Sequence, residues 1–169
     1  MSDLRLDAVT SSEAGVLANL LELYSHDLSD VFPIDLGSDG RFGYPPLSLY
    51  WTEPERRFPF FIKQGNRILG FVLITLGSPV SEDPHVHDIA EFFVSRRYRR
   101  SGVGREAAFM AWDRYPGSWT VRVAERNAGA LAFWRSAIDQ YARGAVTELT
   151  RPGDPIAWRV FQFDSRPAH

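Results

Sequence analysis

A short basic turn with two glycines is the segment whose residue types and spacing are best suited to binding a ligand. It reads Arg99-Arg100-Ser101-Gly102-Val103-Gly104, after an apolar segment at 89–94 and before a helical pattern at 105–114. Glycine lets the backbone approach a ligand closely, and the first N–H groups of a helix lack partners within the helix. Those N–H groups and the helix dipole favour a bound anion. The turn therefore predicts a phosphate-binding site.

Arginines surround this turn and could form forked hydrogen bonds with further phosphate oxygens. They are Arg96, Arg97, Arg99, Arg100 and Arg105. The net charge of the chain is −2, so the positive charge is local and nucleic acid is not an expected partner. The turn lacks the Gly-Lys-Ser/Thr of a Walker loop and the three glycines of a dinucleotide fingerprint.

On its spacing, the turn resembles the acetyl-CoA-binding motif of the GNAT acetyltransferase superfamily, Gln/Arg-x-x-Gly-x-Gly/Ala. Arg99, Gly102 and Gly104 occupy its defined positions. A second similar element is Asn-Ala-Gly-Ala-Leu-Ala-Phe-Trp at 127–134. The resemblance implies acetyl-CoA as the acetyl donor. The residues expected to bind it are Phe92, Phe93, Val94, Arg99, Arg100, Ser101, Gly102, Val103, Gly104, Arg105, Asn127 and Trp134.

The resemblance assigns roles to the two ends of the second element. The Asn127 side chain is expected near the pantetheine arm, although a helix N-cap explains an asparagine at this position equally well. Where better-known subfamilies often carry a tyrosine that protonates the leaving thiolate, this chain has Trp134. An indole N–H does not ionise usefully near neutral pH, so water or another residue such as Tyr141 would have to assist.

Two acidic residues on the expected strand before the turn are candidates for the base that deprotonates an acceptor amine. Glu91 lies between Ala90 and Phe92, and a carboxylate among apolar groups tends to have a raised pKa, which suits proton abstraction. Asp88 lies where some members of the superfamily carry a catalytic glutamate. Strand alternation places the two on opposite faces unless a bulge intervenes. Glu91 is the preferred candidate, and a backbone N–H at 92–94 is expected to stabilise the oxyanion.

The acceptor site is expected in the acidic and aromatic segment at 25–51, because the first two helices usually line it in the superfamily. Candidate substrate-binding residues are Asp27, Tyr44 and Tyr50. Carboxylates and aromatic faces together attract a cationic amine by ion pairing and cation–π contact. Each residue could equally serve only to pack or solvate the loop.

Composition limits the remaining possibilities. The length of 169 residues, 44% hydrophobic content and 24% charged content suit a single globular domain spanning 1–169. With no cysteine, the chain has no thiol nucleophile that could carry an acyl intermediate. His85 and His87 have no third ligand nearby, so no metal is expected. No signal-peptide pattern and no membrane-spanning apolar run is present, so the expected location is cytoplasmic.

The order of predicted elements is strand, helix, helix, three strands, helix, strand, helix, two strands. The helices are expected at 14–24, 47–52, 105–114 and from 127, and hairpins at 58–75 and 145–163. This mixed α/β order is similar to the GNAT core: a mostly antiparallel central sheet flanked by helices, with the fourth and fifth strands splayed apart.

These features together predict an N-acetyltransferase that transfers an acetyl group directly, in a ternary complex, to the primary amine of a small cationic molecule. Homodimers are frequent in this fold. Two alternatives remain: a non-catalytic acyl-CoA-binding regulatory module, and an acetyltransferase acting on a protein or peptide amine.

Overall fold

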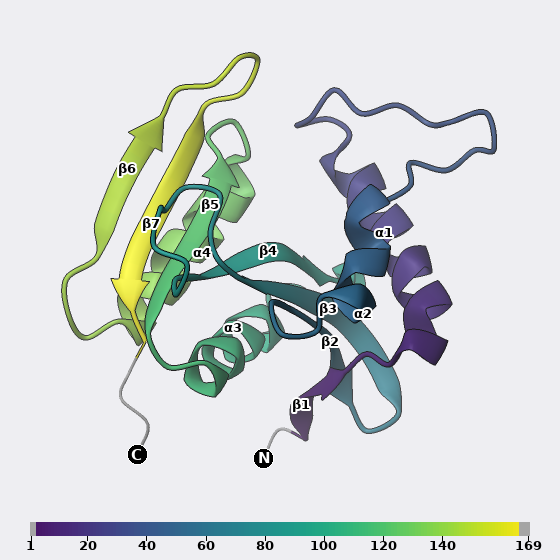
Figure 1. Ribbon diagram of the computed structural model, residues 1–169, viewed down its shortest axis with the longest axis horizontal. Helices are drawn as coiled ribbons and strands as arrows, with labels where there is room; N and C mark the ends of the chain where they lie inside the picture. Colours follow the sequence, from purple (N-terminus) through teal and green to yellow (C-terminus); the bar gives the residue numbers. More distant parts are fainter. Residues whose placement is uncertain (1–2, 166–169) are drawn as a thin grey trace.

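The computed structural model describes residues 3–165, which build a seven-stranded sheet with helices on both of its faces (Figure 1). The strand order is β1-β2-β3-β4-β5-β7-β6, and every neighbouring pair is antiparallel except β4 and β5. The strands are β1 (Leu4–Ala8), β2 (Arg57–Gln64), β3 (Arg67–Leu76), β4 (His87–Val94), β5 (Ser118–Ala124), β6 (Thr147–Arg151) and β7 (Trp158–Asp164). The predicted mixed α/β fold is confirmed.

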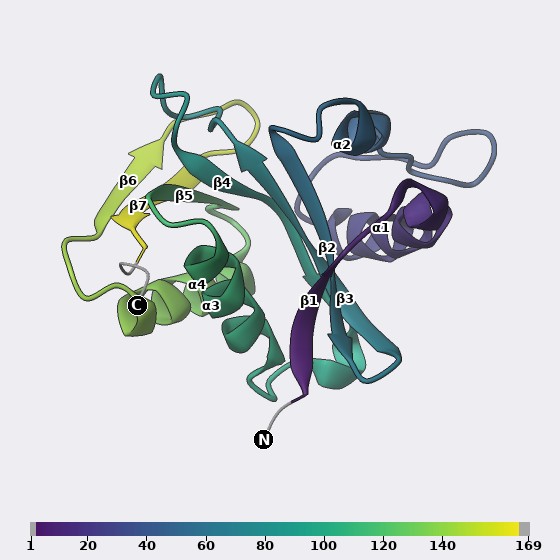
Figure 2. The ribbon, with the colours of Figure 1, turned by 60° about the horizontal axis from the view of Figure 1, so that its bottom comes forward.

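Two hydrophobic cores hold the helices to the two faces of the sheet. Helices α3 (Val103–Arg114) and α4 (Ala128–Tyr141) cover one face, and α1 (Ala14–Leu28) and the short α2 (Leu49–Thr52) cover the other (Figure 2). In α3, Ala107, Ala108 and Ala111 are buried at helical spacing, and such small side chains let the helix lie close to the strands. The smaller core joins Leu17 and Leu21 of α1 to the opposite face.

The parallel pair β4 and β5 separates after three residue pairs. Pairing runs from His87 with Trp119 to Ile89 with Val121, whereas β4 continues to Val94 and β5 to Ala124. Figure 1 shows the two strands diverging from this point. The backbone edge of β4 that faces β5 therefore has no strand partner from Ala90 onward. An extended ligand could bind along this edge, although the Val94 carbonyl already accepts a hydrogen bond from Arg99 Nε.

Most predicted elements are found, with shifted ends. Helix α1 extends to Leu28 because Leu17, Leu21 and Ser25 continue one buried face, so Asp27 lies on a helix and not on a loop. Helix α3 begins at Val103, within the glycine turn. No helix in the described residues is long and apolar enough to cross a membrane.

Candidate functional site

The turn before α3 contains two residues with positive φ angles. Gly102 is the N-cap residue with a φ of 89°, and Arg100 also has a positive φ, of 59°. A β-carbon at Gly102 would be strained at this φ, which glycine adopts freely. No side chain in the described part of the chain caps this helix end, so its first N–H groups are available to an anion.

The arginines of the turn differ in how far they are already engaged. The Arg99 Nε–H donates to the Val94 carbonyl oxygen at 2.7 Å, and Arg99 Nη2 pairs with Asp27 at 2.5 Å. Arg96 also pairs with Asp27, at 2.9 Å. Arg105 donates to Gln140. Within residues 3–165, neither Arg97 nor Arg100 has a side-chain hydrogen bond or ion pair, although the Arg97 guanidinium lies 5.8 Å from the centre of the Tyr98 ring. These two arginines are therefore the ones most available to a phosphate.

The second glycine of the motif, Gly104, has a packing role. A β-carbon there would lie 3.2 Å from the Phe133 ring of α4 and 3.7 Å from the Phe92 ring of β4. This helix turn therefore packs directly against aromatic side chains, which sets the position of the α3 N-terminus relative to the free edge of β4.

A β-bulge in β4 decides the relation between the two candidate bases. The register with β3 pairs Leu73 with Glu91 and Ile74 with Ile89, which leaves Ala90 as the extra residue. The bulge returns Glu91 to the face of the sheet that Asp88 occupies, the face covered by α1 and α2. Strand alternation alone would have separated the two carboxylates, so this bulge brings them together.

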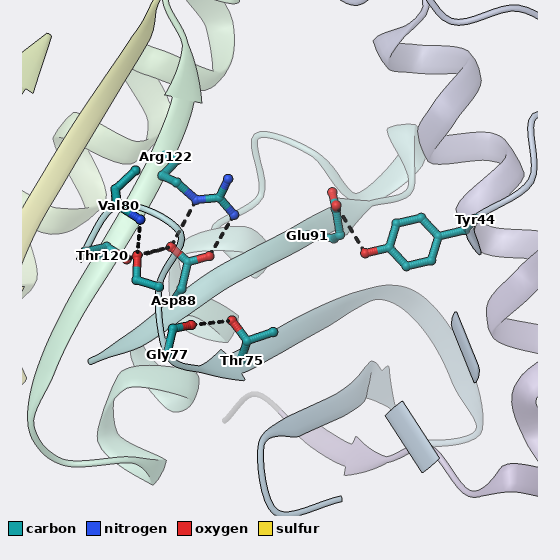
Figure 3. A network of polar contacts seen from close by, with 9 residues as sticks. Tyr44, Thr75, Gly77, Val80, Asp88, Glu91, Thr120 and Arg122 are labelled. Carbon is teal, nitrogen blue, oxygen red and sulfur yellow. Dashed lines mark hydrogen bonds and ion pairs between the residues drawn. The ribbon is translucent and has the colours of Figure 1, made fainter. Parts of the chain in front are cut away.

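Glu91 lies under two tyrosines from the α1 side. The Tyr44 hydroxyl donates to Glu91 Oε1 at 3.3 Å (Figure 3), and Tyr24 of α1 also hydrogen bonds to this carboxyl. Burial raises the pKa of Glu91, while the hydrogen bonds from Tyr24 and Tyr44 and the charge of Arg122 partly oppose the rise. A carboxyl group with a raised pKa in a pocket suits general base catalysis.

Asp88 is instead enclosed by partners. Its side chain has no exposed surface, and it accepts hydrogen bonds from Thr120 at 2.6 Å and from Arg122 Nε and Nη2 at 3.2 and 2.8 Å (Figure 3). Ser78 lies 3.5 Å from the same carboxylate. Through these contacts Asp88 links β4 to β5 and to the β3–β4 loop. Glu91, in contrast, faces open space.

That space is a pocket of about 540 Å³ on the α1–α2 face. Tyr44, Tyr50, Glu91 and Arg122 line it, together with residues 75–79 and 81–84, from the end of β3 and the β3–β4 connection. Two of the three predicted substrate-binding residues therefore meet the preferred base. The third, Asp27, lies away from this pocket, paired with Arg96 and Arg99 beside the glycine turn.

Sequence reasoning missed Tyr24 and Arg122. Tyr24 looked like part of the apolar side of its helix, and its ring does pack edge-on against Phe71 while its hydroxyl reaches Glu91. Arg122 had no distinguishing neighbour in the sequence. Its position became evident from the register of β4 with β5, which pairs Asp88 with Thr120, two residues before Arg122.

The second motif has a structural role at both ends. Asn127 caps α4 by accepting a hydrogen bond from the Ala130 N–H at 3.2 Å, as the N-cap interpretation expects. Trp134 is buried and meets the Phe92 ring edge-on, at 4.8 Å between centroids. The Tyr141 hydroxyl donates to Asp113 within the core under α3 and α4, so it does not face the pocket.

Comparison with known proteins decides the family. Residues 17–137, well over half of the chain, match the model of the acetyltransferase (GNAT) family. The chain belongs to the GNAT family. An acetyltransferase from Thermus thermophilus has a similar structure, with 19% identity, a TM-score of 0.67, and coverage of 97% of this chain and 99% of that chain. No curated protein matched the sequence.

A second similar structure is a spermidine N-acetyltransferase from Vibrio cholerae in complex with CoA and spermine. It has 13% identity and a TM-score of 0.67, and 96% of each chain is covered. Membership of the GNAT family makes this chain an acetyltransferase with acetyl-CoA as the donor. Its own residues fit that donor: the free edge of β4 suits the amide groups of pantetheine, and the uncapped α3 N-terminus suits the pyrophosphate.

Proposed function

We propose that this GNAT acetyltransferase transfers the acetyl group of acetyl-CoA directly to a primary amine of a small cationic molecule. The observation that supports this most strongly is the position of Glu91. This half-buried carboxyl group on β4 lines the pocket, directly after the point where β4 and β5 separate. An acceptor bound in the pocket and a donor bound between β4 and β5 would therefore meet at Glu91.

Glu91 would serve as the base. An ammonium group has no lone pair, so the acceptor must lose a proton before it attacks a thioester. The raised pKa of Glu91 improves its match to an amine, and the hydroxyl groups of Tyr24 and Tyr44 hold the carboxyl in place. Asp88, the other predicted base, is already bound to Arg122 and Thr120, which supports Glu91 for this role.

The residues that would hold acetyl-CoA are those of the open edge of β4 and of the turn from Arg99 to Arg105. On β4, Phe92 and Val94 present their backbone groups to that edge, whereas the backbone groups of Phe93 face β3. The bound donor supplies an activated acetyl group as a thioester. The chain would contribute by orienting the donor: backbone groups on the open edge of β4 would hold the pantetheine arm. A hydrogen-bond donor preorganised near the thioester carbonyl is worth about 3–4 kcal/mol of barrier. Gly102 leaves the helix N–H groups exposed to the pyrophosphate.

The pocket supports a small acceptor over a protein. Its volume of about 540 Å³ lies within the range of roughly 300–1,000 Å³ that is usual for small-molecule sites. Glu82 and Asp83 are exposed on its β3–β4 side, and the rings of Tyr44 and Tyr50 form its α2 side. Acidic and aromatic groups together favour a cationic amine.

The experiment that tests this function begins with calorimetric titration of the protein with acetyl-CoA, alone and as Gly102→Val. Gly65→Val is the matched control, because Gly65 also has a positive φ, of 56°, but lies in the β2–β3 hairpin. We expect saturable binding that Gly102→Val loses and Gly65→Val keeps.

CoA release in the presence of a panel of amines and amino acids then tests turnover, with Glu91→Gln as the inactive comparison. Binding of acetyl-CoA with no release on any acceptor would favour the acyl-CoA-binding regulatory module. Release on peptide N-termini but on no small molecule would favour a protein acceptor.

A further inference from the structure

One group in the pocket has no part in the proposed proton transfer, namely the guanidinium of Arg122. Arginine offers five N–H donors in a planar fork. Asp88 accepts hydrogen bonds from one side of the guanidinium, from Nε at 3.2 Å and from Nη2 at 2.8 Å. Elsewhere in residues 3–165 no hydrogen-bond partner is found for Nη1. The outer end of the fork, formed by Nη1 and the second N–H of Nη2, is therefore open.

The open end belongs to the pocket that holds Glu91. Arg122 and Glu91 both line the pocket, and the Arg122 side chain keeps 22% of its surface exposed. Figure 3 shows them on neighbouring strands and on the same side of the sheet. The bulge at Ala90 produces this arrangement, because it turns Glu91 toward the face where Arg122 meets Asp88.

Asp88 fixes Arg122 in one orientation. The carboxylate is fully buried and shares its charge among Arg122, Thr120 and Ser78. A guanidinium held by two hydrogen bonds loses little conformational freedom when it binds a second anion. Arg122 is in this sense preorganised for a ligand.

The other charges of the pocket do not occupy the outer N–H groups of Arg122. Glu91 interacts with Arg122 through its charge, but in the described residues no hydrogen bond joins the two side chains. Glu53 is paired with Arg57 at 2.8 Å, so it does not compete for Arg122. Glu82 and Asp83 line the β3–β4 side of the pocket, but in the described residues neither forms a hydrogen bond or ion pair with Arg122. Arg56 also lines the pocket, with no ion pair in the described part of the chain, and adds positive charge.

We propose that Arg122 binds a carboxylate on the acceptor, so that the acceptor is a zwitterionic amino acid and not a polyamine. This rests on the proposed function, since Glu91 receives the amine of the same molecule. The end of the Arg122 fork matches the two oxygens of a carboxylate. A polyamine has no group for this donor and would leave a guanidinium facing its ammonium groups.

The first test uses the unaltered protein and acceptors that differ in one charge. CoA release is measured with the common amino acids, each against its carboxamide, and with spermidine and spermine. We expect kcat/KM for the best amino acid to exceed that of its carboxamide by at least about tenfold, the effect of a hydrogen bond to a charged group. Spermidine and spermine are expected to be poorer acceptors than that amino acid.

The second test assigns the selectivity to Arg122. Arg122→Lys keeps the charge and the partner of Asp88 but removes the fork, so the acid-to-amide ratio should fall toward one. Because Arg122→Gln alone would leave Asp88 unpaired, it is combined with Asp88→Asn to keep the site neutral. Arg135→Gln is the matched control, since Arg135 pairs with Glu148 on α4 and β6, away from the pocket, and the ratio should not change.

The outcomes separate this inference from the proposed function. If carboxamides or polyamines are acetylated as well as amino acids, the role of Arg122 is refuted while the N-acetyltransferase function stands. If the ratio is large but survives Arg122→Lys and the double variant, another group binds the carboxylate and the assignment to Arg122 fails. If neither amines nor amino acids cause CoA release, the proposed function fails, and this inference with it.

Discussion

The ion pair between Asp88 and Arg122 should be the most costly one to break in this protein. Asp88 has no exposed surface, whereas the Arg122 side chain keeps 22% of its surface in contact with solvent. Asparagine at position 88 would turn its amide N–H₂ toward an N–H of Arg122 in either orientation, because Arg122 Nε bonds to one oxygen of Asp88 and Nη2 to the other. Asp88→Asn therefore removes a charge and also places two donors face to face.

The size of the effect follows from this burial. Removing one partner of a fully buried pair costs about 3–5 kcal/mol, and the partial exposure of Arg122 favours the lower end. We expect a loss of about 3 kcal/mol in the free energy of unfolding, which for a chain of this length lowers Tm by about 6–12 °C. Urea unfolding gives the free energy, and a scanning measurement gives Tm.

Asp7→Asn is the matched control, because Asp7 makes the same kind of pair on the surface. It lies 2.9 Å from Arg5 Nε, and its side chain is 34% exposed. Exposed pairs contribute about 0–1 kcal/mol. If Asp88→Asn costs no more than Asp7→Asn, water must reach Asp88, and the argument that Asp88 holds Arg122 in a dry, fixed position is refuted.

Three further predictions concern the proposed site. Glu91→Gln should lower kcat by about 100-fold or more while calorimetry shows unchanged acetyl-CoA affinity; full turnover would remove Glu91 as the base. Tyr44→Phe removes a hydrogen bond that lowers the pKa of Glu91, so the pKa of Glu91 should rise in this variant. The acid limb of the pH profile of kcat/KM should then move to higher pH, and a shift to lower pH would contradict the contact between Tyr44 and Glu91. Gly70→Ala would place a β-carbon 1.9 Å from the Phe93 carbonyl oxygen, so it should destabilise the fold by about 1–3 kcal/mol and reduce acetyl-CoA binding. An unchanged urea midpoint would show that β4 can shift to make room.

The sequence was sufficient for the local features of the fold. The glycines before α3, the alternating strands and the apolar helix faces each depend on residues close together in the chain, so their physical basis can be read directly. The N-cap role of Asn127 is of this kind, because the cap and its N–H partner are three residues apart. The end of α1 was placed too early, since its last turn is supported by a buried face that needs the sheet.

The relations between distant residues were decided by the tertiary structure. The preference for Glu91 over Asp88 rested on its apolar neighbours, but the bulge at Ala90 places both on one face, and their different partners separate their roles. Arg122 is 34 residues from Asp88 in the chain, and Tyr44 is 47 residues from Glu91. Such contacts depend on strand register and on helix packing, where a shift of one residue would turn each side chain to the other face. The sequence by itself therefore determined the elements and the glycine turn before α3, and the packed sheet determined which charges meet in the pocket.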